Sequence, residues 1–324
     1  MRRARIMKPK VVVTRRWPTE VEDRLNAEFD VSLNRTDQPF DGRELRAALE
    51  GADAVLPTVT DRIGADLFEG GVRARILGNF GVGFNHIDVA AAKAAGLVVT
   101  NTPGVLTDAT ADLAMTLLLM CARRAGEGER ELRSGKWTGW RPTHLCGTHV
   151  TGKTIGIIGM GRIGQAMARR CHFGFGMDVV FFDSNPIAGL DVPARQLPTV
   201  EDVLGTADFV SLHCPGGGEN YHLIDDRRLA CMKWSAFLIN TARGDVVDEH
   251  ALVRALENRR IAGAGLDVFE GEPRVPGRLA ERQDVVLLPH LGSATKETRI
   301  AMGMRIIENL KAFFSGRAPP DAVS

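Results

Sequence analysis

Short apolar runs alternate with amphipathic segments along most of the chain. Between these runs lie helix-like stretches such as EVEDRLNAEF and GRELRAALE. Because the runs are nearly continuous in Val, Ile and Leu, they predict a parallel sheet with both faces covered. In the first part of the chain the predicted strands are 10–14, 30–34, 52–58, 73–79 and 96–101.

A second series of runs begins at TIGIIG and predicts a second doubly wound unit. The two series are separated by a long helical segment, about 107–135, and by an irregular stretch at 135–150. Inside that helix, Leu113–Ala122 spans ten residues that are apolar apart from Thr116, about half a membrane span, and indicates a buried helix. The strands predicted for the second unit are 154–159, 178–183, 208–213, 236–242, 263–269 and 284–290.

The pattern therefore predicts an α/β fold with two doubly wound parallel-sheet domains. A length of 324 residues suits two domains of roughly 150 residues each. The amphipathic segment 296–314 has no strand after it, so we expect it to fold back on the first unit. One predicted domain is residues 1–105 plus 295–324, and the other is residues 106–294.

Composition and charge narrow the class of protein. The 41 Lys and Arg residues balance 40 Asp and Glu residues, which disfavours a nucleic-acid or membrane-surface partner. The five cysteines are widely spaced with no C-x-x-C, so we expect no disulfide framework, no metal site and a reducing compartment. The basic start MRRARIMKPK precedes only VVVT, too short for a signal-peptide apolar region, which favours a cytoplasmic protein.

A G-x-G-x-x-G motif runs from Gly159 through Gly161 to Gly164, between an apolar strand and a helix. In a dinucleotide-binding unit the first glycine makes the tight turn and the second admits the pyrophosphate. The third lets the helix pack on the strand, and the helix N-terminus donates N–H groups to the phosphates. The alternative is an ordinary strand-to-helix turn, because a glycine-rich chain can form the motif by chance.

An acidic residue at the expected distance supports the dinucleotide interpretation. Asp183 ends the run DVVFFD, 19 residues after Gly164. A carboxylate there accepts hydrogen bonds from the ribose 2′-hydroxyl and repels a 2′-phosphate. Ser184 and Asn185 follow, with no Arg to bind that phosphate, so we expect NAD rather than NADP. Arg162 is the one residue here that favours NADP.

Three charged or titratable residues follow the last three predicted strands. Arg243 comes after AFLINTA, Glu272 after GAGLDVF, and His290 ends DVVLLPH. Ligands of open α/β sheets bind at the carboxyl ends of the strands, so these side chains are expected at the nicotinamide. Histidine is a natural proton donor for ketone reduction, a carboxylate orients it, and a guanidinium binds a carboxylate. Each could also be structural: a salt bridge, a solvated turn residue and a core histidine.

These segments resemble the D-isomer-specific 2-hydroxyacid dehydrogenases over nearly the whole chain. The similar segments are GKTIGIIGMGRIGQAMA, NTARGDVVDE, GLDVFEGEP and PHLGSAT. The resemblance implies that Arg243 binds the substrate, Glu272 tunes His290, His290 is the acid/base, and Asp267 is accessory. It further implies cofactor contacts from Thr110, Gly159, Gly161, Arg162, Ile163, Gly164, Asp183, His213, Cys214, Pro215, Thr241, Ala242, Arg243, Asp267, His290 and Gly292.

The resemblance also assigns roles to the two domains. The first would be a flavodoxin-like substrate domain and the second a Rossmann NAD(P)-binding domain, with the active site in the cleft between them. NFGVGFNHID at 79–88 is similar to the family loop whose amides meet the substrate carboxylate, so Gly81, Val82 and Gly83 are expected to bind it. An ordinary strand-to-helix turn is the alternative there. Leu56 would help to wall the pocket.

Finer features point to one branch of the family. WTGWRP at 137–142 is similar to the W-x-x-W-x-P of glyoxylate/hydroxypyruvate reductases, although Trp137 and Trp140 equally fit core or dimer-interface aromatics. We therefore expect an NADH-dependent reductase of glyoxylate or hydroxypyruvate that makes the D-2-hydroxy acid and forms a homodimer. Two features depart from the family pattern: PGGGEN at 215–220 replaces a Leu-Thr-Pro loop, and Asp183 replaces the Arg of NADPH-preferring reductases.

Two other functions remain open, and a third is disfavoured. Formate oxidation is disfavoured, because formate dehydrogenases have Gln where this chain has Glu272. A short phosphoglycerate dehydrogenase or another D-2-hydroxyacid dehydrogenase fits the same motifs. A non-enzymatic NAD(H)-sensing scaffold of the same fold also fits them, because such co-repressors retain the catalytic residues.

Overall fold

The computed structural model describes residues 8–323, so the first seven residues of the basic start lie outside the described part. Contacts divide the chain into unit 1, Met1–Leu106 with Ser293–Ser324, and unit 2, Thr107–Gly292. The sequence predicts boundaries after residue 105 and before residue 295. Leu106, Ser293 and Ala294 instead lie with unit 1, because the chain passes between the units just before the helices that begin at residues 107 and 296.

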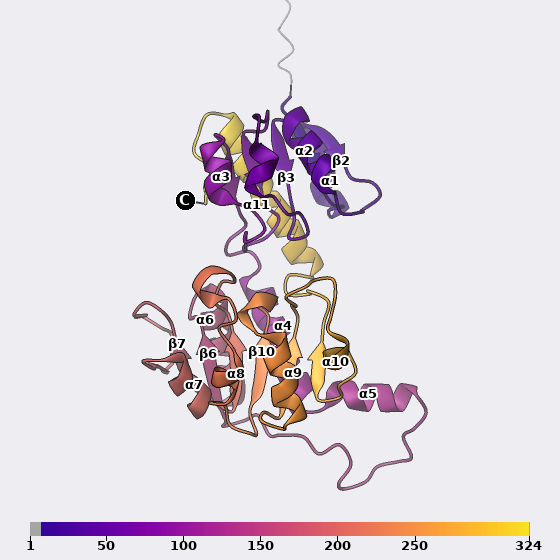
Figure 1. Ribbon diagram of the computed structural model, residues 1–324, viewed down its shortest axis with the longest axis vertical. Helices are drawn as coiled ribbons and strands as arrows, with labels where there is room; N and C mark the ends of the chain where they lie inside the picture. Colours follow the sequence, from indigo (N-terminus) through magenta and orange to yellow (C-terminus); the bar gives the residue numbers. More distant parts are fainter. Residues whose placement is uncertain (1–7, 324) are drawn as a thin grey trace, which may run out of the picture. The chain divides into compact units, whose positions relative to one another are not determined.

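Unit 1 is a five-stranded parallel sheet in the order β2-β1-β3-β4-β5. Figure 1 labels β2 and β3 of this sheet. This is the flavodoxin-like strand order. Its topological switch point, where the order of the strands reverses, lies between β1 and β3. The strands are β1 (Lys10–Val13), β2 (Asp30–Leu33), β3 (Ala54–Leu56), β4 (Ile76–Gly78) and β5 (Val98–Thr100). The helices are α1 (Thr19–Glu28), α2 (Gly42–Gly51), α3 (Val89–Ala94) and α11 (Lys296–Phe314).

Alternating apolar residues give the unit 1 sheet a core on each face. Val11 and Val13 pack with α1 and α11, whereas Val12 lies against the cluster that contains α2 and α3. A strand with both faces covered needs apolar residues on both, which explains its continuous Val run. The end of the chain adds to the sheet edge, because Ala322 forms an antiparallel bridge with Thr100.

Unit 2 is a seven-stranded parallel sheet in the order β12-β11-β10-β9-β6-β7-β8. Counted within the unit, the first six strands follow the 3-2-1-4-5-6 order of the Rossmann fold, and a seventh extends it. The strands are β6 (Thr154–Ile158), β7 (Asp178–Phe182), β8 (Ala194–Gln196), β9 (Phe209–Leu212), β10 (Phe237–Asn240), β11 (Gly263–Leu266) and β12 (Val285–Leu287). The helices are α4 (Thr107–Ala122), α5 (Ala125–Arg133), α6 (Arg162–Arg169), α7 (Val200–Thr206), α8 (Asp226–Leu229), α9 (Glu249–Glu257) and α10 (Gly277–Ala280).

The unit 2 sheet is also covered on both faces. Helices α4 and α6 share a buried cluster with Ile155 and Ile157, and helices α7, α8 and α9 share the other with Ile158. Helix α4 buries Leu117 and Leu118 completely, as expected for the apolar run at 113–122. Within residues 8–323, no helix is both long enough and apolar enough to span a bilayer.

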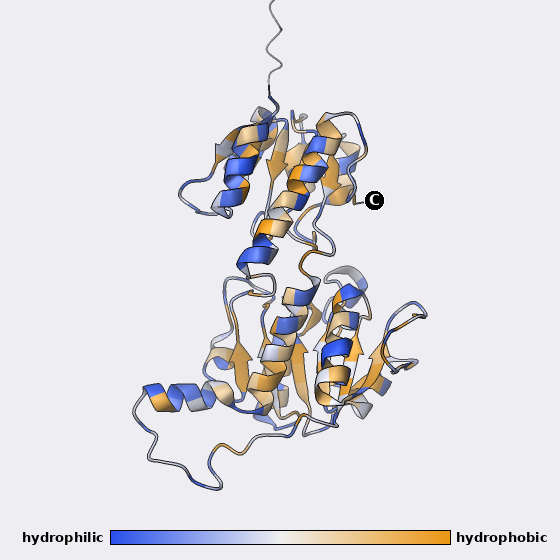
Figure 2. Ribbon diagram, turned by 180° about the vertical axis from the view of Figure 1, so that it is seen from behind, coloured by the Kyte–Doolittle hydropathy of each residue, from blue (hydrophilic) through white to orange (hydrophobic). Residues whose placement is uncertain are grey.

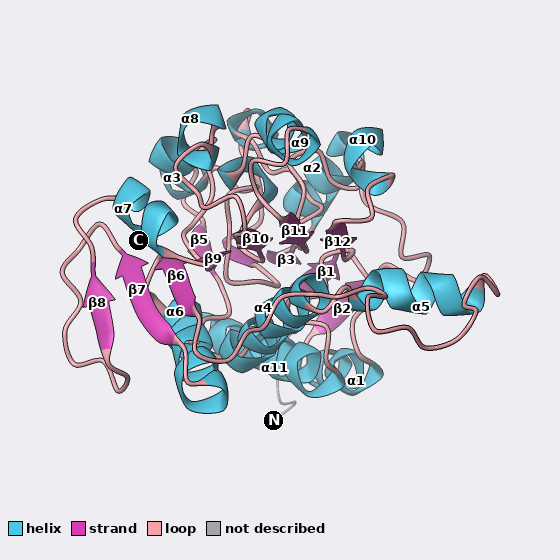
Figure 3. Ribbon diagram, turned by 90° about the horizontal axis from the view of Figure 1, so that it is seen from below, coloured by secondary structure: helices cyan, strands magenta, loops and turns pink. Residues whose placement is uncertain are grey.

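The predicted fold class is confirmed, and each of the eleven predicted runs contains a strand. The sequence missed β8, a three-residue strand at the edge of the sheet beside β7 (Figure 3). Its residues Ala194-Arg195-Gln196 lie at an exposed edge and carry no apolar pattern. The expectation of one helical segment over 107–135 was wrong, because Arg124 adopts a left-handed backbone (φ 53°) that separates α4 from α5.

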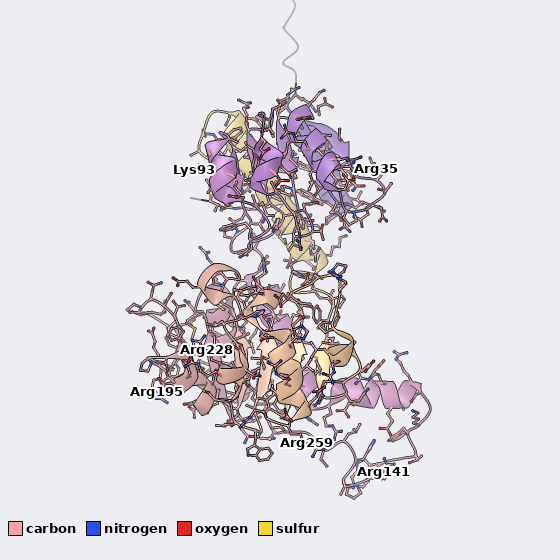
Figure 4. The ribbon with its side chains drawn as sticks, viewed as in Figure 1. Arg35, Lys93, Arg141, Arg195, Arg228 and Arg259 are labelled. Atoms are coloured by element: carbon pink, nitrogen blue, oxygen red, sulfur yellow. The ribbon has the colours of Figure 1, made fainter. Side chains whose placement is uncertain are left out.

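Helix α5 and the loop that follows it form an exposed arm, residues 125–149. No residue of α5 is buried, and Figure 2 colours the helix mainly blue. Figure 4 places Arg141 in the loop beyond α5, where its guanidinium donates to Thr138. Trp140, one residue before, is 81% exposed.

Candidate active site

His290 and Glu272 form a close pair in unit 2. The loop after β12 carries His290, and the loop after β11 carries Glu272. Their Nδ1 and Oε2 atoms are 2.9 Å apart. Burial alone would raise the pKa of Glu272, but its hydrogen bond to His290 and that from the Phe269 N–H hold this pKa below the usual value. Glu272 is therefore ionised and accepts, so Nδ1 of His290 carries the hydrogen.

Asp267 fixes the turn on which His290 stands. Its carbonyl accepts the N–H of His290 at 2.9 Å, and its carboxylate accepts those of Leu291 at 2.6 Å and Gly292 at 2.8 Å. His290 itself has a left-handed backbone, φ 55°, which costs a β-carbon-bearing residue on the order of 1 kcal/mol. The three hydrogen bonds that Asp267 accepts from the N–H groups of His290, Leu291 and Gly292 offset that strain.

The Asp267 carboxyl is buried below the turn. Burial raises its pKa from 3.8 to about 6, against the two backbone donors and the nearby His290. Thr110, on α4, donates its hydroxyl to the carbonyl oxygen of Gly292 at 3.2 Å. The structure thus gives Asp267, Gly292 and Thr110 a common task, which is to hold the His290 turn.

Arg243 lies directly after β10 and is half-buried. Burial lowers the pKa of its guanidinium, and the negative charges of Glu272 and Asp245 act in the opposite direction. Asn240 fixes this bend, because its Nδ2 donates to the Arg243 carbonyl and its Oδ1 accepts the Ala242 N–H. The three strand-end residues of the sequence prediction are therefore close enough for Glu272 to interact with both Arg243 and His290.

A second polar cluster, which the sequence prediction missed, holds the Glu272 loop. The buried carboxylate of Glu249 accepts the N–H of Glu270 at 2.9 Å, and burial raises the pKa of Glu249. The Glu270 carboxylate in turn receives the hydroxyl of Tyr221 at 2.9 Å and lies 3.1 Å from Nε2 of His222. A Cβ at Gly244 would clash with the Phe269–Glu270 peptide, so only glycine allows this close packing.

The glycines of the G-x-G-x-x-G turn differ in how much space surrounds them. Gly159 has φ 93°, and a Cβ there would lie 2.7 Å from the backbone nitrogen of Cys214. A Cβ at Gly164 would clash with the Gly159 carbonyl, so this glycine lets α6 approach β6. A Cβ at Gly161 would meet nothing within 4 Å. Two glycines are thus explained by packing, and Gly161 borders open space.

The start of α6 suits a phosphate group. The cap position is Gly161, and no side chain caps the helix. Arg162 is exposed and Ile163 half-buried at this end. Nearby, Asp183 accepts the N–H of Met160 at 2.9 Å through one carboxylate oxygen, which ties the end of β7 to the glycine turn. Each carboxylate oxygen has a second lone pair, so Asp183 can still accept a ribose hydroxyl.

Two buried polar atoms at the ends of β9 and β10 are free of hydrogen-bond partners within the described residues. They are Nδ1 of His213 and Oγ1 of Thr241. Burial lowers the pKa of His213 to about 4 and raises that of Cys214, beside Pro215, to about 11, so both are neutral near pH 7. Unpaired buried groups are costly unless a ligand satisfies them, so this edge fits a bound dinucleotide.

In unit 1, Leu56 is the last residue of β3, and the other expected substrate residues lie after β4. Leu56 is fully buried in the cluster that contains α1 and α11, so its role as a pocket wall stays a prediction. Gly81, Val82 and Gly83 form a half-exposed loop after β4. Unit 2 contains all the proposed cofactor and catalytic residues, and unit 1 contains the proposed carboxylate loop.

Several residues that support these groups were missed by the sequence prediction, although some stood inside the motifs. Asp245 and Glu249 follow Arg243 in ARGDVVDE, and Asn79 begins NFGVGFNHID. No sequence signal could have placed Tyr221 and His222 beside Glu270, because 48 residues separate His222 from it.

The chain is similar to a known protein family and to individual members of it. Residues 115–292 match the NAD-binding-domain model of the D-isomer-specific 2-hydroxyacid dehydrogenases. A glyoxylate reductase of Korarchaeum cryptofilum is 44% identical over 322 residues, which cover 98% of this chain and 96% of the relative. A glyoxylate reductase of Thermococcus litoralis is 43% identical over 324 residues, 98% of this chain and 97% of the relative.

A solved structure shows the same two-unit fold. It is an NADPH-dependent glyoxylate/hydroxypyruvate reductase from Sinorhizobium meliloti in complex with NADP and malonate. The two chains are 35% identical, with a TM-score of 0.88, and the match covers 98% of this chain and 97% of the other. The similarity therefore extends over both units.

Proposed function

Because this chain belongs to the D-isomer-specific 2-hydroxyacid dehydrogenase family, an NAD(P)-dependent enzyme family, we propose that it reduces glyoxylate to glycolate. The observation that carries the proposal is the His290–Glu272 pair, 2.9 Å apart, in the same unit as a glycine turn that fits a dinucleotide. Hydroxypyruvate is proposed as a second substrate, with the D-2-hydroxy acid as its product.

The chemistry of His290 follows from its partner. The ionised Glu272 accepts the hydrogen on Nδ1, so Nε2 is the nitrogen left to face a substrate. When bound, the reduced nicotinamide supplies a hydride to the carbonyl carbon. His290 gives the proton on Nε2 to the carbonyl oxygen, and Glu272 stabilises the imidazolium before that transfer and orients the ring.

Arg243 is proposed to bind the 2-oxo acid. Its planar guanidinium can hold a carboxylate or a polarised carbonyl through two parallel hydrogen bonds. The Asn240 side chain fixes the backbone on both sides of this residue, which limits the positions the guanidinium can take. The Gly81–Gly83 loop of unit 1 is proposed to bind the substrate carboxylate through its amides.

NADH is proposed as the preferred cofactor. Asp183 follows the last residue of β7, and its carboxylate would repel the 2′-phosphate of NADPH. The Sinorhizobium reductase is NADPH-dependent, so relatives of this chain differ in cofactor. Replacing Asp183 with Ser should reduce the preference of kcat/KM for NADH over NADPH by at least about 10-fold, since one charge repulsion is removed.

The substrate panel is the direct test of the proposed function. The protein is mixed with NADH or NADPH and with glyoxylate, hydroxypyruvate or pyruvate, and nicotinamide absorbance is followed. We expect the highest kcat/KM with NADH and glyoxylate. Cofactor binding without turnover of any acid would contradict the proposal and favour an NAD(H)-sensing scaffold.

A homodimer through the arm is proposed as the working assembly. The arm exposes Leu132 and Trp140, 62% and 81% respectively, together with about half of Trp137. Large apolar side chains on a surface are typical of protein interfaces. Light scattering should give twice the chain mass, and the variant Trp137→Ser/Trp140→Ser should shift towards the monomer. A monomeric wild-type mass would contradict this assembly.

A cytoplasmic location is also proposed. All five cysteines are free thiols, in keeping with a reducing compartment. Fractionation of cells that express the protein should recover the activity with cytoplasmic enzymes, and recovery in the secreted or periplasmic fraction would contradict the location.

A further inference from the structure

The glycine loop after β4 has its carbonyl groups fixed from outside the loop. The Asn79 side chain is fully buried, and its Nδ2 donates to the carbonyl oxygens of Gly81 and Gly83 at 3.1 and 3.0 Å. Nδ2 of Asn101 donates to the carbonyl of Val82 at 2.8 Å. Two asparagine side chains therefore hold three consecutive carbonyl groups.

Fixing a carbonyl also fixes the next N–H. In a trans peptide the C=O of one residue and the N–H of the next point in opposite directions. The only cis peptide among the described residues is elsewhere, at Glu272–Pro273. The N–H groups of Val82, Gly83 and Phe84 thus point away from the asparagine side chains, and no hydrogen bond within residues 8–323 uses them.

The orientation of the Asn79 amide follows from its neighbours. If the amide were flipped, its oxygen would face two carbonyl oxygens, which cannot donate. Its Oδ1 instead lies 2.9 Å from Nε2 of His86, so that nitrogen carries the hydrogen and donates. Both hydrogens of the Asn79 NH2 group are then committed to the loop.

We propose that Asn79 and Asn101 are positioning residues that preorganise the N–H groups of Val82, Gly83 and Phe84 to bind the carboxylate of the 2-oxo acid. The inference rests on the proposed function, and it identifies the side chains that make the loop an anion site. Consecutive N–H groups that face away from anchored carbonyls are suited to an anion. Because the donors are preset, binding the carboxylate requires little reorganisation.

The end of the chain braces Asn101. The Asn101 N–H donates to the carbonyl of Asp321 at 3.3 Å. The carboxylate of Asp321 is held by the guanidinium of Arg305 and by Nδ2 of Asn309, both on α11. Helix α11 therefore supports the substrate loop through the chain terminus, which gives the return of the last helix to unit 1 a functional consequence.

Replacing Asn79 with Asp tests the proposal, because it removes two donors with almost no change of shape. We expect KM for glyoxylate to rise at least about 10-fold, since a hydrogen bond to a charged group is lost or misdirected. The values of kcat and of KM for NADH should stay within about 3-fold. Asn101→Ala removes one donor and should raise KM for glyoxylate about 3- to 10-fold with the same split.

Asn34 offers a matched control. It is a buried asparagine whose Nδ2 also bridges two backbone carbonyls, those of Thr14 and Gln38, at 2.7 Å each. Asn34→Asp should leave KM for glyoxylate within about 2-fold. An equal rise of KM in Asn34→Asp and Asn79→Asp would show a general effect on unit 1 and overturn the proposal, as would a fall in kcat alone.

Calorimetry with oxalate separates this proposal from the proposed function. Oxalate is a stable dicarboxylate probe, and its Kd in the presence of NADH should rise at least about 3-fold in Asn101→Ala. An unchanged Kd overturns the positioning role even if wild-type protein turns over glyoxylate. Absence of turnover in a wild-type protein that binds oxalate more tightly than Asn101→Ala would refute only the reduction. If Asn79→Asp does not fold, Asn101→Ala decides.

Discussion

The two parallel sheets of this chain share one topology rule but carry different chemistry at the carboxyl ends of their strands. After β4 in unit 1, Asn79 and Asn101 hold the carbonyl groups of a glycine loop, and the N–H groups of Val82, Gly83 and Phe84 have no hydrogen-bond partner among residues 8–323. After β10 and β12 in unit 2, Arg243 and His290 carry charge or can exchange a proton. We therefore propose that the loop of unit 1 binds the substrate without proton transfer, and that the edge of unit 2 both binds the substrate and transfers a proton.

Mutations in the unit 1 loop and at the unit 2 edge should change different kinetic parameters. An amide donor contributes the same hydrogen bond at any pH, so damage to the unit 1 loop should change substrate affinity. A proton donor contributes in the transition state, so damage to His290 should change turnover.

His290→Gln should have the largest effect. The change removes the proposed proton donor, so kcat should fall at least about 100-fold while the Kd for NADH stays within about 2-fold. His144→Gln is the matched control, because His144 forms a similar pair with Glu131, at 2.8 Å, in the arm. Near-wild-type turnover in His290→Gln, or an equal loss in His144→Gln, would contradict the role of His290 as the proton donor.

Arg243→Lys should lower kcat/KM for glyoxylate about 10- to 100-fold. Lysine keeps the charge but loses the planar pair of donors. The control is Arg228→Lys, which changes a half-buried arginine of the same unit that donates to Glu201 (labelled in Figure 4). The expected loss there is under about 2-fold. If the two variants behaved alike, Arg243 would have only a structural role.

Two variants of the glycine turn should affect different properties, one the binding of NADH and the other the stability of the fold. Gly161→Ala places a Cβ in open space, so the protein should unfold at a similar urea concentration while the Kd for NADH rises about 10-fold. Gly164→Ala places its Cβ against the Gly159 carbonyl, so the free energy of unfolding should fall by about 1–3 kcal/mol. Reversed results in urea unfolding and NADH titration would contradict the assigned roles.

The smallest predicted effect concerns the pH dependence of stability in unit 2. Burial lowers the pKa of His213 from 6.5 to about 4, so between these pH values the unfolded chain binds a proton that the folded chain does not. Stability is therefore lost as the pH falls through this window. His213→Gln should show a smaller loss in urea unfolding between pH 7 and pH 4.5.

Asp267 has the opposite sign over a similar window. Burial raises its pKa from 3.8 to about 6, so the folded chain keeps a proton that the unfolded chain has released. Its contribution is greatest at low pH and is lost as the pH rises through about 6. In His213→Gln the contribution of Asp267 is no longer opposed by His213, so the loss of stability between pH 7 and pH 4.5 should be smaller than in the wild type. A steeper loss than in wild type would show that one sign is wrong.

Much of the fold could be predicted because it depends on local apolar pattern. Continuous Val and Ile runs such as Val11–Val13 mark strands that are covered on both faces, and all eleven predicted runs contain strands. The edge strand β8 escaped because an exposed edge needs no apolar residues. The helix break at Arg124 was not predicted, because helix-forming residues stand on both sides of this one residue with a left-handed backbone.

The candidate site could be predicted only where a short motif carries it. Arg243, Glu272 and His290 follow predicted strands, so the topology rule alone brings them to one edge. The residues that support them are set by tertiary contacts: Glu249 reaches Glu270, and Asn101 reaches Val82, across 21 and 19 residues respectively. Sequence spacing does not encode such contacts, and only the structure makes them visible.

One paired measurement tests the contrast between the two units most directly. It compares kcat and KM for glyoxylate in His290→Gln and Asn79→Asp, with saturating NADH and identical buffer. We expect His290→Gln to lose kcat with little change of KM, and Asn79→Asp to raise KM with little change of kcat. The same parameter changing in both variants would contradict the division between a binding loop in unit 1 and a proton-transfer edge in unit 2.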